Sequence, residues 1–180
     1  MRDRFDVQLF AEVTDIEEAA LVMRHKRVAF MKVAVSGEGG STSDQYVRMQ
    51  GFTQFSEAKS PKEYARQYVD EATERNNVTG YASNISYSFD RYSEHLVHKK
   101  LAQIADNELL GSEAEVEIVV VDIFGDAPHE ARKRIYSVSP GNMGDGTDAL
   151  IYTGVLHAVS GIVLGTATSS DEWKTVTFTE

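Results

Sequence analysis

The stretch Thr79–Asp90 (TGYASNISYSFD) decides the fold class of this 180-residue chain. Its apolar side chains Tyr81, Ile85, Tyr87 and Phe89 point to one side of an extended backbone, and small or polar side chains lie between them. Alternation with a period of two is typical of a strand that has one packed face and one open face. We therefore expect a strand that begins at Gly80.

Further apolar and β-branched runs lie on both sides of this strand and predict a mainly β fold. The expected strands are Arg27–Ser36, Gln45–Gln50, Lys62–Asp70, Glu113–Phe124, Ala131–Ser139, Leu150–Ser160, Ile162–Thr168 and Trp173–Thr179. Gly-rich connections, 37–44 (GEGGSTSD) and 140–148 (PGNMGDGTD), separate some of them. We expect both connections to be loops.

One segment between the strands has helical spacing instead. Val97, Leu101 and Ile104 recur at intervals of four and three, and Ser93 precedes them as an N-cap. The sequence predicts one packed helix over 93–106.

The N-terminal residues differ from the rest, and we divide the chain into an arm (1–24) and a β-domain (25–180). Thr14 and Glu17 form a capping box, and Ile16, Ala19 and Met23 follow on one helical face. Two interpretations stay open, a short helix on the arm or a poorly ordered terminus.

Composition excludes several function classes. The chain has no cysteine, so disulfides, thiolate metal sites and a cysteine nucleophile are excluded. A formal net charge of −10 opposes tight nucleic-acid binding, which needs clustered cations. No apolar run approaches the roughly 20 residues that cross a bilayer, and Asp3 and Asp6 interrupt any secretory signal, so we expect no membrane contact.

No motif nominates a catalytic, cofactor or metal site. His95 and His98 are three residues apart, but no third ligand has a fixed spacing to them, and we expect both on an exposed helix face. Neither Gly-rich loop matches a phosphate-binding pattern. The expectation is therefore no catalytic residue, no cofactor and no metal, and an enzyme ranks third among the function classes.

Acidic residues gather between Asp106 and Glu130, where no Lys or Arg occurs. Glu113, Glu115 and Glu117 alternate with apolar residues, so one strand face would carry three like charges. An ordinary solvated strand explains this pattern. A second interpretation is a negative channel wall, or a surface that pairs with a basic patch on a neighbouring subunit.

Several segments together resemble the major tail tube proteins of tailed phages and prophages of Gram-positive bacteria. The segments are Lys62–Glu71 (KEYARQYVDE), Thr79–Asp90, the helix at 93–106, Val119–Asp122 (VVVD), Arg134–Ser139, Gly144–Gly154 (GDGTDALIYTG), Gly161–Thr166 and Trp173–Thr179. The resemblance implies a β-sandwich or barrel-like domain with one flanking helix. It implies hexameric rings that stack into a tube in the virion tail, built in the host cytoplasm.

The resemblance also implies partners. These are copies of the chain itself, the terminator, tape measure and distal tail proteins, and double-stranded DNA that passes through the lumen without specific binding. Mobile loops are suited to contacts between rings. The candidate inter-ring residues are Gly37, Glu38, Gly39, Gly40, Gly141, Asn142, Gly144 and Asp145.

Two alternatives remain within the virion. One is a receptor- or carbohydrate-binding β-domain, which would need an aromatic-lined pocket. The other is a capsid or decoration protein, because Phe5–Glu12 (FDVQLFAE) resembles the start of many major capsid proteins.

Overall fold

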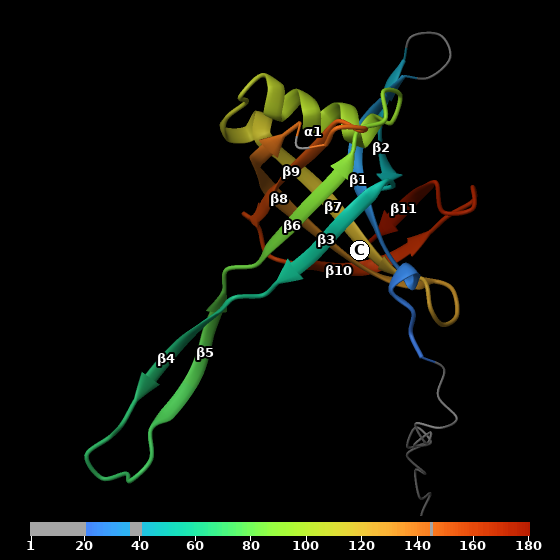
Figure 1. The fold of residues 1–180 in the computed structure, drawn as a ribbon. Coiled ribbons are helices and arrows are strands. Elements are labelled where there is room, and N and C mark those ends of the chain that lie inside the picture. The colour runs from blue at the N-terminus through green and yellow to red at the C-terminus, as the bar shows by residue number, and fades with distance from the viewer. Residues whose placement is uncertain (1–20, 37–40, 145) are drawn as a thin grey trace, which may run out of the picture.

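The computed structural model describes residues 21–36, 41–144 and 146–180, and this part is mainly β-strand with one α-helix (Figure 1). The strands are β1 (Arg27–Ser36), β2 (Thr42–Arg48), β3 (Phe52–Ala58), β4 (Pro61–Arg66), β5 (Arg75–Tyr81), β6 (Asn84–Asp90), β7 (Glu115–Asp122), β8 (His129–Met143), β9 (Ile151–Ala158), β10 (Val163–Thr168) and β11 (Thr175–Thr179). The helix is α1 (Leu96–Asp106), and two 3-10 turns are η1 (Arg24–Lys26) and η2 (Gly111–Ala114).

Six strands close into a barrel in the order β10-β11-β2-β1-β7-β8, and the pairing of β8 with β10 completes the ring. The interior is filled by its own side chains, among them Phe30 from β1 and Val119 and Val121 from β7. Small barrels are packed in this way and have no central channel.

Three further strands extend the sheet beyond the barrel. The first part of β8 pairs with β10, whereas its second part, from Tyr136 on, pairs with β9. The sheet then continues through β6 to β3. We call the second part of β8 together with β9, β6 and β3 the open layer.

A second core lies between the barrel, the open layer and α1. It contains Met31 from β1, Ile118 from β7, Phe89 from β6 and Leu101 from the helix, all fully buried or nearly so. Strands β1 and β7 therefore contribute side chains to both cores, which explains why their sequences are apolar on both faces.

The hairpin of β4 and β5 projects away from this body (Figure 1). Its two strands pair only with each other, and every residue of β4 is exposed. Isolated two-stranded hairpins are marginally stable in water.

The predicted fold class is confirmed, since the chain is mainly β, has a closed barrel and carries one helix. The alternation is confirmed over Asn84–Asp90, with Ile85, Tyr87 and Phe89 buried. The expected start at Gly80 is wrong, because β5 ends at Tyr81, which is exposed, and β6 begins at Asn84. The arm over 1–24 lies almost wholly outside the described residues.

Several predicted boundaries are wrong. The expected strand Lys62–Asp70 ends at Arg66, because the chain turns there into the hairpin tip. The helix begins at Leu96 with His95 as its N-cap, rather than with Ser93. Trp173 has a φ of +64° and lies in the turn before β11, where it packs near Phe30.

Candidate assembly surfaces

The outer face of the open layer, opposite the second core, is almost free of charge. Register pairing brings Ser56, Ser86 and Val155 side by side across three strands. The outward residues are Gln54, Ser56 and Ala58 of β3, Asn84, Ser86, Ser88 and Asp90 of β6, Ile151, Thr153, Val155 and His157 of β9, and Ser137 and Ser139 of β8. Small hydroxyl side chains dominate this face, and it carries no Lys or Arg.

The open layer has an unpaired margin on each side. Strand β3 pairs with β6 alone, so its other edge has no strand partner among the described residues. On the opposite side, β7 pairs with β8 only as far as Ser137, which leaves Val138–Met143 unpaired on that edge. Unpaired strand edges are templates for another chain.

The tip of the β4–β5 hairpin is both apolar and acidic. Val69 is fully exposed at 108% of its reference area, and Tyr68 is about half exposed. Asp70, Glu71 and Glu74 share the same tip. The tip thus presents exposed apolar side chains on a hairpin that is marginal by itself.

The predicted acidic residues do not form a single solvated strand face. Glu113 belongs to η2, and β7 begins at Glu115. Glu115 and Glu117 lie on the same face of β7 as Val119, whose side chain fills the barrel. The two acids therefore lie at one end of the barrel interior. The Tyr46 hydroxyl donates a hydrogen bond to the Glu117 carboxylate, and burial together with this bond raises the pKa of Tyr46.

Lysines surround the same acids. A surface depression of about 560 Å³ is lined by Glu115 and Glu117 and by Lys32, Lys99 and Lys100. Lys32 also lies 3.5 Å from Asp44. The acids thus belong to a mixed-charge region, and their role as a channel wall stays a prediction.

The structure places only some of the candidate inter-ring residues. Gly37, Glu38, Gly39, Gly40 and Asp145 lie outside the described residues. The prediction of a loop at 140–148 is wrong in its first part, because β8 continues through Gly141 and Asn142 to Met143. Pro140 is compatible with a strand here because one edge of β8 is unpaired. Gly144 follows with a φ of +81° and turns the chain.

The prediction of an exposed histidine face is wrong for His98, which is completely buried. Its Nδ1 accepts a hydrogen bond from the Tyr92 amide at 3.1 Å, so its Nε2 carries the proton and donates to the Gln50 carbonyl at 2.7 Å. The ring stacks on Phe89. Burial lowers the pKa of His98. The neutral ring therefore acts as a packing residue of the second core.

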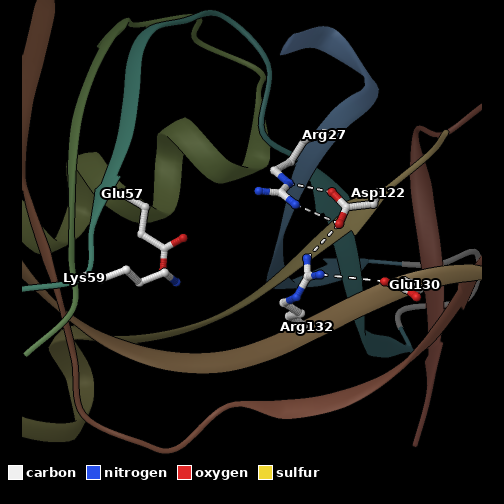
Figure 2. Close-up of polar contacts among 6 residues, drawn as sticks. All are labelled: Arg27, Glu57, Lys59, Asp122, Glu130 and Arg132. Atoms are coloured by element: carbon white, nitrogen blue, oxygen red, sulfur yellow. Dashed lines mark hydrogen bonds and ion pairs between the residues drawn. The ribbon is translucent and has the colours of Figure 1, made fainter. Parts of the chain in front are cut away.

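A buried carboxylate that the sequence did not reveal lies at the end of β7. Asp122 is 4% exposed and accepts hydrogen bonds from Arg27 at 2.9 Å and from Arg132 at 2.7 Å (Figure 2). Burial acts to raise the pKa of Asp122, but the two guanidinium groups outweigh it and hold this pKa below its usual value. The cluster ties β1, β7 and β8 together, and no motif marks it because the three residues are far apart in sequence.

The described residues contain no group of three or more His, Asp or Glu side chains arranged to hold a metal ion. Within the same residues, no helix combines the length and the apolar character that a bilayer crossing requires.

A filled barrel joined to an open layer with two unpaired margins and a projecting hairpin defines a class of β protein whose sheet is incomplete in the single chain. The chain has the fold of phage tail tube proteins. The SPP1 tail tube aligns over 83% of this chain and 82% of its own with a TM-score of 0.59 at 11% identity. The tail of an empty GTA particle, described with C6 symmetry, aligns over 79% of this chain and 98% of its own with a TM-score of 0.54 at 9% identity.

These likenesses are structural. No protein-family model matches the sequence, and no curated protein matches it either. At 9 to 11% identity the comparison establishes the fold alone.

Proposed function

We propose that this chain is the structural subunit of a phage or phage-derived tail tube, in which copies form hexameric rings that stack around a channel for DNA. One observation carries the proposal. The open layer has two unpaired margins and an outer face without Lys or Arg, so copies can join margin to margin with that face toward a common axis.

The barrel of one chain cannot provide the channel, because its side chains fill it. About 16–18 strands are needed for even a small aqueous channel in a single barrel. Six copies, as in the C6 symmetry of the structurally similar GTA tail, would each contribute the four strands of an open layer. A fixed rotation between copies closes such a ring.

The outer face of the open layer suits a conduit for DNA. Binding to phosphates depends on Lys and Arg, and this face has neither. Its side chains are small, with Asp90 as the carboxylate at one end. We therefore propose that this face lines the lumen, in place of Glu113, Glu115 and Glu117, and that the role is structural rather than catalytic.

The hairpin supplies the contact along the axis in this proposal. Its apolar, acidic tip extends beyond the body and is covered only when another ring stacks on it. Gly141 and Asn142, on the unpaired edge of β8, then belong to the contact within a ring.

Assembly of purified protein tests the proposal. Negative-stain microscopy and sedimentation velocity over a rising concentration series should show rings and tubes. The Arg24 guanidinium donates to the Phe55 carbonyl at 3.2 Å, so this carbonyl points to the unpaired margin. Backbone groups of alternate residues point to the same edge of a strand, so those of Glu57 also point to this margin. Glu57→Pro should therefore abolish rings, whereas Glu57→Ala should preserve them.

A map of the assembled tube distinguishes the two lumen assignments. We expect Ser86 and Ser88 on the wall. Compact particles without rings at every concentration would contradict the tube itself, and a wall lined by Glu115 and Glu117 would contradict the assignment of the face.

A further inference from the structure

A groove of about 1270 Å³ opens between β3 and the beginning of β1. Its apolar lining residues belong to the second core or pack against it, and they include Ala29, Met49, Phe55, Ile85 and Val120. A groove that combines partly exposed apolar side chains with polar groups is a common form of binding site.

The rim of the groove is basic, although the chain as a whole has a net charge of −10. Arg24, Arg27, Arg48 and Lys59 line it, and Glu57 is the one acidic residue in the lining. Figure 2 shows Arg27 on one side and Glu57 with Lys59 on the other, directed toward the space between them.

Part of this positive charge is not neutralised. Arg24 donates to the carbonyls of Arg27 at 2.7 Å and of Phe55 at 3.2 Å, which are uncharged acceptors. Arg27 pairs with Asp122 and Lys59 with Glu57, whereas neither Arg24 nor Arg48 has an ion pair among the described residues. The groove thus combines an apolar floor with a rim that attracts anions.

The chain itself supplies a segment of matching chemistry at the mouth of the groove. Leu21, Val22 and Met23 are exposed, and Met23 and Arg24 line the groove. The preceding residues 11–20 (AEVTDIEEAA) contain four acids and no cation, with Val13 and Ile16 between them. Their capping box and spacing predict a helix with one apolar face.

We propose that residues 11–20 dock in the groove of their own chain, with Val13 and Ile16 on the apolar floor and the acids against the basic rim. Ten residues span about 15 Å as a helix, so the segment reaches the rim without a linker. The docked segment covers the apolar lining beside β3. This inference does not depend on tube formation.

Charge reversal with rescue tests the docking in the full-length chain. Hydrogen–deuterium exchange should show protection of residues 12–20 and of β3 in the wild type. Arg48→Glu alone, and Glu17→Lys with Glu18→Lys, should each reduce this protection by roughly ten-fold. Combining the three changes should restore it. Arg66→Glu, on the hairpin, makes the same charge change away from the groove and should leave the protection intact.

Cross-linking identifies the occupant, because the chain has no native cysteine. Ala19→Cys with Glu57→Cys should be joined by a short bis-maleimide within one chain, and Ala19→Cys with Ser139→Cys should not. A cross-link that appears only between two chains would place the segment, or another part, of a second copy in the groove and overturn the proposal. Unprotected residues 12–20 together with no cross-link would also overturn it.

Discussion

The barrel and the β4–β5 hairpin are both built from antiparallel strands, but they differ in whether the strand edges and side chains find partners within the same chain. In the barrel each strand has neighbours on both edges, and the interior is filled by side chains of the same chain. In the hairpin both outer edges are unpaired and the side chains are exposed. The apolar packing that stabilises the fold therefore lies in the barrel and the second core, whereas the hairpin and the margins of the open layer are the surfaces that we propose for assembly.

The largest stability effect should come from the carboxylate that joins three barrel strands. Asp122→Asn leaves Arg27 and Arg132 without their shared counter-charge, and we expect a loss of about 3 kcal/mol in the free energy of unfolding. Chemical denaturation at neutral pH measures it. Asp126→Asn, in the exposed turn between β7 and β8, is the control and should change little.

The pH dependence of this difference has a defined sign. The folded-state pKa of Asp122 lies below its ordinary value of 3.8, so the carboxylate stabilises the fold above that value. The advantage of the wild type over Asp122→Asn should be constant near neutral pH and shrink as the pH falls below 3.8. A difference that persists undiminished in acid would contradict the ion-pair role.

A smaller effect should come from the close contact between β10 and β11 in the barrel. A Cβ atom on Gly165 of β10 would lie 2.3 Å from the Thr179 carbonyl oxygen and 2.7 Å from the Phe178 ring. Gly165→Ala should therefore cost about 2 kcal/mol through displaced backbone, as overpacking does. Gly161→Ala meets no atom within 4 Å and is the matched control. Equal midpoints for both variants in urea would show that β10 and β11 are not packed as closely as this at Gly165.

The next largest effect should be the fall in unfolding free energy at low pH that arises from His98 in the second core. His98 has both ring nitrogens bonded in the neutral form, and burial holds its pKa below the ordinary value of 6.5. The unfolded chain therefore binds more protons below pH 6.5, and stability falls as the pH drops through that region, by at most about 1.4 kcal/mol per unit for one such group.

Denaturant titrations at several pH values between 7.5 and 5.0 give the unfolding free energy at each pH and so test this response. His98→Gln should flatten the slope even if it lowers the stability at neutral pH. His95 has a pKa lowered in the same direction and supplies the remaining slope. An unchanged slope in His98→Gln would refute the role of this ring.

The sequence predicted what depends on local periodicity. The alternation of Ile85, Tyr87 and Phe89 and the helical spacing of Val97, Leu101 and Ile104 both reappear as buried faces. Strands buried on two sides, such as β1 and β7, were also recognisable as apolar runs, but their two different cores were not.

Features that depend on long-range register could not be predicted. The Asp122 cluster joins residues 95 positions apart, and the closure of β8 on β10 follows from pairings that no local pattern encodes. The acids at Glu115 and Glu117 looked like a solvated face because Lys32 and Tyr46, which approach them, come from other strands. Strand β3 was missed because its alternation is interrupted by a bulge between Phe52 and Gln54.

The smallest effect on stability should accompany a large effect on assembly, and it lies in the hairpin. Tyr68→Ser with Val69→Ser removes apolar groups that contact no core, so the unfolding free energy should stay within about 0.5 kcal/mol of the wild type. If stacked rings cover the hairpin tip, the same change should abolish tubes in micrographs while single rings persist. Leu110→Ser, equally exposed beside η2, should leave tubes intact. Tubes of normal length from the double variant would mean that the tip makes no contact between rings and that contacts of the open layer alone direct assembly.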